Sequence, residues 1–227
     1  MVKALFADQP FNEKYHLGAV NSINWARILA QMVYYFLAYF HVRSQIPHPE
    51  SSELQFVVPT GNFGDVLAGY YAKRMGLPMG KLVVATNSND ILARFWRSGR
   101  YESVDSTLGG AAAAAAAPAP AQAQVQVQQG GKKPADGSVR ATWSPAMDIL
   151  VSSNFERLLW YLVYETSSDA ASDGERRASA GATIDGWMKS VKSNGCVEVP
   201  VEVLELARRD FLAERVSDDQ VCPRVCM

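Results

Sequence analysis

Between residues 25 and 40 the apolar positions recur with the 3.6-residue period of a helix. The run comprises Ile28, Leu29, Met32, Val33, Phe36, Leu37 and Phe40. The polar stretch at 21–24 offers side chains that can cap the start of a helix. The segment 25–40 has only 16 residues and contains Arg27 and Gln31, whereas a membrane-spanning helix needs about 20 apolar residues. We therefore predict a buried helix and no membrane as a partner.

Two short apolar runs predict strands that flank a second helix. The first run lies at 54–58 and the second at 82–86. Between them, residues 66–75 carry an amphipathic helical pattern that a Gly-Leu-Pro sequence ends. Two strands joined through a helix form a βαβ unit, in which the strands are parallel and the crossover is right-handed. A third helical pattern follows the second strand over 91–96.

The composition changes sharply between residues 106 and 140. This stretch consists mainly of Ala, Pro, Gln and Gly and includes seven consecutive alanines at 111–117. Nothing beside it offers an apolar face to bury, so we predict a disordered surface insertion. Helical patterns return at 155–162, at about 182–192 and at about 200–214.

These patterns divide the chain into four parts. Residues 1–105 belong to an α/β domain, 106–140 are the low-complexity insertion, 141–166 continue the α/β domain, and 167–227 form a helical segment with a frayed tail. Only two convincing strands are found, whereas parallel sheets normally pair several strands and are covered on both faces. The sequence therefore predicts an α/β fold of which the chain forms a part.

The join between the first strand and its helix has the residue types of a phosphate-binding loop. It reads Pro-Thr-Gly-Asn-Phe-Gly-Asp over 59–65. Its two glycines let the backbone approach a bulky anion, and free N–H groups converge there with the positive end of the helix dipole. Asn62 adds a side-chain donor, Asp65 is placed to cap first-turn N–H groups, and Phe63 is expected to pack beneath the loop. A tight strand-to-helix turn that binds nothing is the alternative.

Composition and charge exclude several functional classes. The 227 residues are 48% hydrophobic and 20% charged, with a formal net charge of −1, which is typical of a globular protein that does not bind nucleic acid. Three cysteines are too few for a disulfide framework, and the first eight residues lack the features of a secretory signal, so we expect a cytoplasmic location. His16, His41 and His48 form no ligand pattern, so we predict surface histidines and no metal.

Four separate motifs in this chain resemble threonine synthase of the fungal type. They are NSINWARI at 21–28, PTGNFGD at 59–65, ATNSNDIL at 85–92, and SPAMDI through NFER at 144–157. The resemblance implies a pyridoxal-phosphate-dependent carbon–oxygen lyase acting on phosphates, which converts O-phospho-L-homoserine and water to L-threonine and phosphate. It also implies a partial fold-type-II (tryptophan-synthase β-like) large domain, with a parallel βαβ core and a helical C-terminal part.

The resemblance also assigns residues to a site. It implies that the cofactor's phosphate is held by Gly61, Asn62, Phe63, Gly64 and Asp65. It places near the substrate Asn21, Ser22, Arg27, Asn154 and Arg157. An arginine in this set can pair with the substrate's phosphate. Helix capping by the asparagines and Ser22, and a surface ion pair of Arg157, are the alternatives.

One feature of the family is absent from this chain. In the family, a lysine in a Phe-Lys-Asp context upstream of the first motif forms the Schiff base with the cofactor, and no lysine here has that context. The chain thus resembles the middle third of the enzyme, and we expect it alone to be inactive and to bind pyridoxal phosphate weakly without a Schiff base.

A non-catalytic remnant that binds a phosphate ligand or a full-length partner is the alternative hypothesis. A dehydratase of the same cofactor class is a weaker one, because the Asn-Ser-Ile-Asn-Trp and Ser-Pro-Ala-Met-Asp segments favour threonine synthase. The sequence leaves the oligomeric state open.

Overall fold

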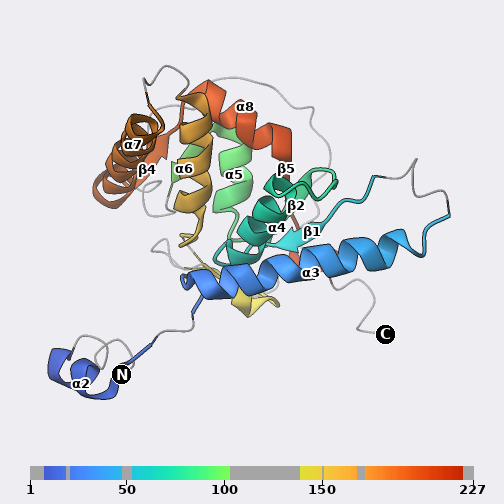
Figure 1. Cartoon of the computed structure of the whole chain (residues 1–227), viewed down its shortest axis with the longest axis horizontal. Helices are drawn as coiled ribbons and strands as arrows, with labels where there is room; N and C mark the ends of the chain where they lie inside the picture. Colours follow the sequence, from blue (N-terminus) through green and yellow to red (C-terminus); the bar gives the residue numbers. More distant parts are fainter. Residues whose placement is uncertain are drawn as a thin grey trace, which may run out of the picture.

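The computed structural model describes residues 8–18, 21–47, 53–102, 139–149, 151–167 and 172–221. The insertion predicted at 106–140 lies outside these residues except for its last two, and so does His48. In chain order the elements are α2 (Gln9–Tyr15), α3 (Trp25–Arg43), β1 (Val57–Pro59), α4 (Gly64–Arg74), β2 (Leu82–Thr86), α5 (Ile91–Ser98), β3 (Arg100–Glu102), the 3₁₀ turn η3 (Pro145–Met147), α6 (Phe155–Thr166), α7 (Asp173–Asn194), β4 (Cys196–Glu198), α8 (Val201–Asp210), β5 (Phe211–Arg215) and α9 (Asp218–Val221) (Figure 1).

A parallel sheet with the strand order β1-β2-β5 forms the centre of the fold. β1, α4 and β2 make the βαβ unit that the sequence predicts, so that prediction is confirmed. The expected helix over 200–214 is wrong from Phe211 onward, because this segment pairs in register with the central strand, Leu82 opposite Phe211 and Thr86 opposite Arg215. The short strands β3 and β4 form a separate antiparallel pair.

The two faces of the parallel sheet differ in what covers them. Val58, Val84 and Phe211 are at most 4% exposed and belong to one core cluster with side chains of α4, α5, α6 and α8. On the opposite face Val57 is 66% and Leu212 43% exposed, and both are in register with β2. Between them Val83 of β2 is only 9% exposed. Parallel sheets are normally covered on both faces, so within the described part of the chain this face is uncovered at its two outer strands.

Helix α3 packs on α4 with one side only. Ile28, Met32, Tyr35 and Tyr39 are buried there. The opposite side carries Leu29, Val33, Leu37 and Phe40, which are 52–65% exposed and which we call the outer stripe. The prediction of a buried helix therefore holds for one side of α3 only, and Figure 1 shows α3 lying along the outside of the helical layer. No helix in the described residues is both long and apolar enough to span a bilayer.

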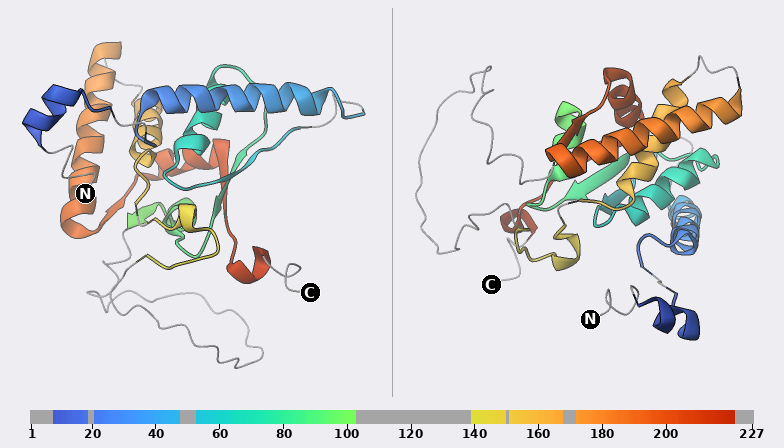
Figure 2. Two further views of the ribbon diagram at one scale, coloured as in Figure 1. Left: turned by 90° about the horizontal axis from the view of Figure 1, so that it is seen from below. Right: turned by 90° about the vertical axis from the view of Figure 1, so that its left-hand side faces the viewer.

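Helix α7 begins nine residues before the start expected at about 182. Ser172 caps it by accepting a hydrogen bond from the Glu175 amide at 3.2 Å, and Glu three residues after Ser is the signature of a capping box. The helix packs along α6 and lies at the outer side of the helical layer (Figure 2). His16 and His41 are exposed, as predicted.

Candidate functional site

The candidate site is the loop between β1 and α4. Gly61 and Phe63 both adopt left-handed backbone conformations, with φ of 42° and 65°, and the Phe63 amide closes the turn by donating to the Thr60 carbonyl at 2.7 Å. A left-handed conformation is uncommon for phenylalanine. Core packing holds it here, because the Phe63 ring is fully buried against the rings of Trp96 and Phe155.

The main-chain amides of this loop divide into engaged and free groups. The Gly61 amide donates to the Met147 sulfur at 3.0 Å. The amides of Asn62, Gly64 and Asp65 donate to no acceptor in the described residues. These free N–H groups lie at the positive end of the α4 dipole, an arrangement that favours an anion.

The space beside Gly64 is compatible with a small ligand group. A Cβ atom built on Gly64 would meet nothing closer than 3.5 Å, the nearest atoms being the Gln31 Oε1 and the Asn154 Nδ2. A side chain at this position would therefore fit without a clash, between Gln31, Asn154 and the Ser22 carbonyl. The loop thus fits the phosphate of a cofactor through three amides.

Asp65 does not cap the helix as the sequence predicts. Its Oδ1 is buried and has no hydrogen-bond partner among the described atoms, and its backbone carbonyl accepts from the Tyr35 hydroxyl at 2.8 Å. Burial raises the pKa of the Asp65 carboxyl above its usual value. Burial also raises the pKa of the Tyr35 hydroxyl.

Asn154 ties three segments of the chain to the loop. It is fully buried, and its Nδ2 donates to the Ser22 carbonyl at 2.7 Å and to the Asn62 carbonyl at 3.0 Å. Arg157 donates to the Asn154 Oδ1 at 2.9 Å and to the Ile23 carbonyl at 2.8 Å. In the described residues Arg157 therefore donates only to uncharged oxygens and forms no ion pair, so the alternative of a surface ion pair is wrong. Ser22, Asn154 and Arg157 are brought together at the loop.

Asn21 and Arg27 remain at the surface. The Asn21 Oδ1 accepts from the Ile23 amide at 3.0 Å, which makes a local turn before α3. Arg27 is exposed, and its side chain has no partner among the described residues. It lies one turn before Gln31 on the flank of α3 that faces Gly64. Its guanidinium is thus free on the side of α3 that borders the loop.

Two further residues at the loop have no place in the sequence predictions. Met147 accepts from the Gly61 amide, and the Ser152 hydroxyl donates to the Gly61 carbonyl at 3.0 Å. The Ser152 amide in turn donates to the Tyr101 hydroxyl at 3.1 Å. Both lie within the 144–157 motif, and Ser152 precedes Asn154 among the polar residues expected to cap the next helix, but neither was assigned to the site.

Asp148 attaches the segment 139–149 to the end of β2. Its carboxylate accepts from the Thr142 amide and hydroxyl at 2.9 and 2.7 Å, from the Asn87 side chain at 2.7 Å and from the Asn89 side chain at 3.0 Å. Burial acts to raise the pKa of Asp148, but these hydrogen bonds outweigh it and lower the pKa below its usual value. This network holds Met147 over the loop.

No lysine contacts the loop in the described residues. Three of the lysines have partners elsewhere: Lys73 contacts the Gly80 carbonyl and Asp210, Lys81 contacts the Arg208 carbonyl, and Lys189 contacts Asp185. The site can therefore hold an anion, but the described residues place no amine beside it.

Comparison with known proteins gives one consistent family. No protein-family model matches the chain. The chain is 50% identical over 220 residues to threonine synthase from Schizosaccharomyces pombe, covering 97% of the chain and 37% of that protein. It is 46% identical over 220 residues to threonine synthase from Saccharomyces cerevisiae, covering 97% of the chain and 35% of that protein.

Solved structures agree with the sequence relatives. The crystal structure of threonine synthase from yeast matches with a TM-score of 0.72 and 45% identity, covering 96% of this chain and 35% of that one. A structure of threonine synthase from Brucella melitensis with PLP bound matches with a TM-score of 0.68 and 38% identity, covering 96% of this chain and 36% of that one. The described fold is thus part of a fold-type-II α/β domain. In sequence and in fold the chain belongs with the threonine synthases, and it spans about a third of the length of its relatives.

Proposed function

We propose that this chain is the phosphate-holding part of a pyridoxal-phosphate-dependent threonine synthase, which converts O-phospho-L-homoserine and water to L-threonine and phosphate. The observation that carries the proposal is the set of free amides of Asn62, Gly64 and Asp65 at the start of α4. The named relatives and the PLP-bound structural neighbour support the cofactor and the reaction. When bound, the cofactor supplies an electron sink for the carbon atoms that react.

Each residue of the site has a defined part in this proposal. The amides of Asn62, Gly64 and Asp65 bind the cofactor's phosphate, while the left-handed conformations of Gly61 and Phe63 give the loop its shape. These five are the residues that the family resemblance implies for the cofactor.

The substrate-side residues fall into two groups. Asn154, Arg157 and Ser22 fix the position of the loop against α3 through their hydrogen bonds. Arg27, with an unpaired guanidinium on the flank facing the loop, is the residue that we assign to the substrate's phosphate, with Asn21 at the turn before it.

The lysine that the chemistry requires is not in the described residues at the loop. A lysine anchors this cofactor and moves protons in such enzymes. We therefore expect no release of phosphate from O-phosphohomoserine by the purified chain alone. Phosphate release at a rate typical of an enzyme would contradict this expectation.

The loop assignment can be tested by equilibrium dialysis of the full chain against pyridoxal phosphate. We expect weak binding that inorganic phosphate displaces, and no binding of pyridoxal, which lacks the phosphate. Gly64→Ala adds a methyl group at 3.5 Å from its nearest neighbours and should weaken binding about tenfold, the equivalent of one good hydrogen bond.

Gly186→Ala is the matched control, because a Cβ at Gly186 on α7 has no atom within 4 Å. It should bind as the unaltered chain does. Equal binding by all three proteins would refute the loop assignment. Borohydride reduction should give no adduct at a single lysine, and a stoichiometric one would overturn the expectation that no lysine is placed here.

The second candidate function is a non-catalytic protein that binds a phosphate ligand. The same free amides and the missing lysine support it. It differs from the first in one outcome: the chain should stay inactive even when the rest of a threonine synthase is supplied. A cytoplasmic location stays a prediction for either candidate, and cell fractionation tests it.

A further inference from the structure

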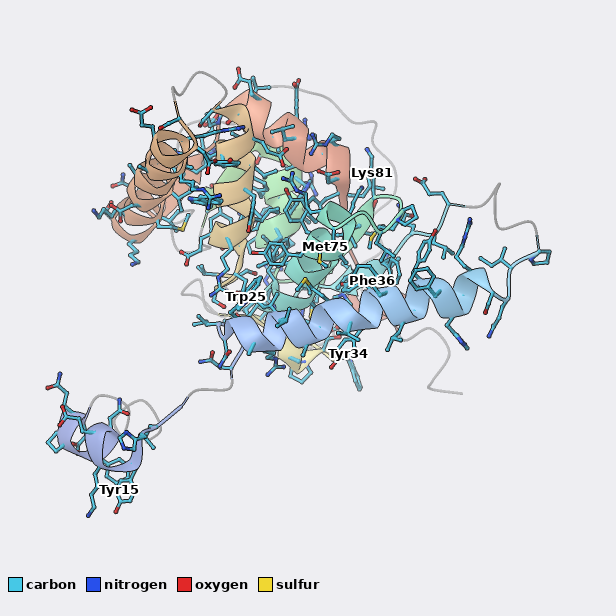
Figure 3. All side chains as sticks on the ribbon, in the orientation of Figure 1. Tyr15, Trp25, Tyr34, Phe36, Met75 and Lys81 are labelled. Carbon is cyan, nitrogen blue, oxygen red and sulfur yellow. The ribbon has the colours of Figure 1, made fainter. Side chains whose placement is uncertain are left out.

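A pocket lies where the start of α6, the last turns of α7 and strand β3 meet. α6 and α7 lie side by side, with side chains between them (Figure 3). The pocket has a volume of about 280 Å³, and its apolar wall is formed by Tyr101, Val151, Met188 and Val191. Sites for drug-sized molecules begin at about 300 Å³, so this pocket suits a smaller molecule.

Ser153 gives the pocket a buried hydroxyl that lacks a partner. The Ser153 Oγ has no hydrogen-bond partner among the described residues, and Ser153 lines the pocket. The Tyr101 hydroxyl accepts from the Ser152 amide at 3.1 Å and donates to no acceptor in the described part of the chain. Buried polar groups in folded proteins are nearly always paired. These two hydroxyls therefore favour a ligand that carries a polar group.

Two residues of opposite charge also line the pocket. Glu156 lies in the first turn of α6 and Lys192 in the last turn of α7. Both are exposed, and neither forms a salt bridge within the described residues. An unpaired acid and an unpaired base beside an apolar wall match a ligand with an ammonium group, a carboxylate and an apolar body.

We propose that this pocket binds an apolar α-amino acid. The ammonium group of the ligand donates to the Glu156 carboxylate, and its carboxylate accepts from the Lys192 ammonium and the Ser153 hydroxyl. Its side chain packs on the apolar wall. A free amino acid carries both charges at neutral pH, whereas the backbone of an internal peptide segment carries neither, so the free amino acid is the better match.

The pocket adjoins the segment that holds the phosphate loop. The Ser152 hydroxyl donates to the Gly61 carbonyl and the Asn154 amide to the Asn62 carbonyl, both at 3.0 Å. Ser153 lies between these two residues in the chain. A ligand bonded to Ser153 therefore touches the segment that positions the loop, while its own binding does not depend on what the loop binds.

Titration of the full chain with L-leucine, followed by amide NMR spectra, tests the pocket. We expect saturable shifts of the signals from 151–156 and 188–192, with a Kd of about 1 mM or below. Two analogues each lack one charge: 4-methylpentanoate has no ammonium group, and 3-methylbutylamine has no carboxylate. Each should bind at least about tenfold more weakly than L-leucine, because one charge-assisted hydrogen bond is lost.

Variants of the pocket assign each charge to its partner. Glu156→Gln should weaken L-leucine binding about tenfold and should not weaken 4-methylpentanoate, which has no ammonium group for Glu156 to bind. Lys192→Gln should weaken L-leucine and should not weaken 3-methylbutylamine. Ser153→Ala should weaken L-leucine and 4-methylpentanoate by the same factor, because both carry the carboxylate.

Glu202→Gln is the matched control. Glu202 is an exposed acid in the first turn of α8, as Glu156 is in the first turn of α6, and it does not line the pocket. This variant should bind L-leucine as the unaltered chain does.

Three outcomes overturn the proposal. The first is the absence of saturable shifts at the pocket, which would assign the Ser153 hydroxyl to a water molecule only. The others are equal affinity for L-leucine and both analogues, and equal affinity of all variants for L-leucine. None of these readouts uses pyridoxal phosphate or activity. Failure of this site is thereby distinguished from failure of the phosphate-loop assignment, which dialysis against pyridoxal phosphate decides.

Discussion

At the scale of single residues, the loop depends on a buried asparagine more than on its own side chains. Asn154 donates to two backbone carbonyls from segments that are 132 and 92 positions away in the sequence. The side chain of Asp65, in contrast, does not cap α4, and its buried Oδ1 has no hydrogen-bond partner among the described atoms. The sequence suggested both residues, but only the tertiary structure separates their roles.

Removing the Asn154 amide should destabilise the protein. Asn154→Ala leaves the carbonyls of Ser22 and Asn62 without their side-chain donor, which costs about 1–3 kcal/mol. Urea unfolding measures this loss. Asn194→Ala, at an exposed position on α7, is the control and should change the free energy of unfolding by less than about 0.5 kcal/mol.

The effect of Asn154→Asp should depend on pH. A carboxylate at this fully buried position would face two carbonyl oxygens, and we expect burial and this repulsion to raise its folded pKa against the opposing effect of the Arg157 guanidinium on its other oxygen. The variant is then destabilised at neutral pH and recovers as the pH falls through that raised pKa, because a protonated carboxyl can donate again. A deficit that is the same at all pH values would contradict this account.

At the scale of elements, the contact between α3 and α4 depends on a glycine. A Cβ on Gly69 of α4 would lie 2.7 Å from the ring carbons of Tyr35 on α3. Tyr35 is 4% exposed and bonds to the Asp65 carbonyl, so its ring has no free space to move into. The two helices can therefore approach closely only with glycine at this position.

Gly69→Ala should be destabilising although alanine is the better helix former. The clash with Tyr35 should cost about 1–3 kcal/mol, which exceeds the gain of about 1 kcal/mol from helix propensity. Gly186→Ala on α7 has open space around it and should be neutral or stabilising. Thermal unfolding of both variants decides the point, and a stabilised Gly69→Ala protein would show that the helices are not packed in this way.

The attachment of the segment 139–149 is a second property of elements, and it should depend on pH. The folded pKa of Asp148 is lowered, so its contribution to stability is present above the unfolded pKa, about 3.9, and is lost as the pH falls through the folded pKa. Asp148→Asn should therefore speed hydrogen exchange of 139–149 at neutral pH. Near pH 3 the difference from the unaltered chain should shrink, and a difference that grows there would refute the assignment.

At the scale of the whole molecule, the chain has one well-formed core and one uncovered side. The core joins the sheet face at Val58, Val84 and Phe211 to the helices packed on it. Val57, Leu212 and the outer stripe of α3 lie outside this core. The sequence predicted a partial fold from the shortage of strands, and the relatives, of which the chain covers about a third, agree with that prediction.

The differences between the predicted and the observed elements have identifiable physical causes. β5 follows α8 without a glycine or proline between them, and its apolar residues continue the helical pattern, so only pairing with β2 reveals the strand. The early start of α7 had a local signal in Ser172 and Glu175 that was missed. The exposed side of α3 had no such signal, because its apolar residues look the same whether or not anything covers them.

The sequence by itself determined the βαβ unit, the glycine loop and the start of α3, because caps, turns and periodicity are local properties of the chain. Only the tertiary structure decided which amides of the loop are free, because Met147 must be placed in space before its sulfur can engage the amide of Gly61. It also decided that β5 is a strand and that Val57 and Leu212 stay exposed on one face of the sheet. These are long-range contacts, and no local pattern encodes which distant residue will supply the partner.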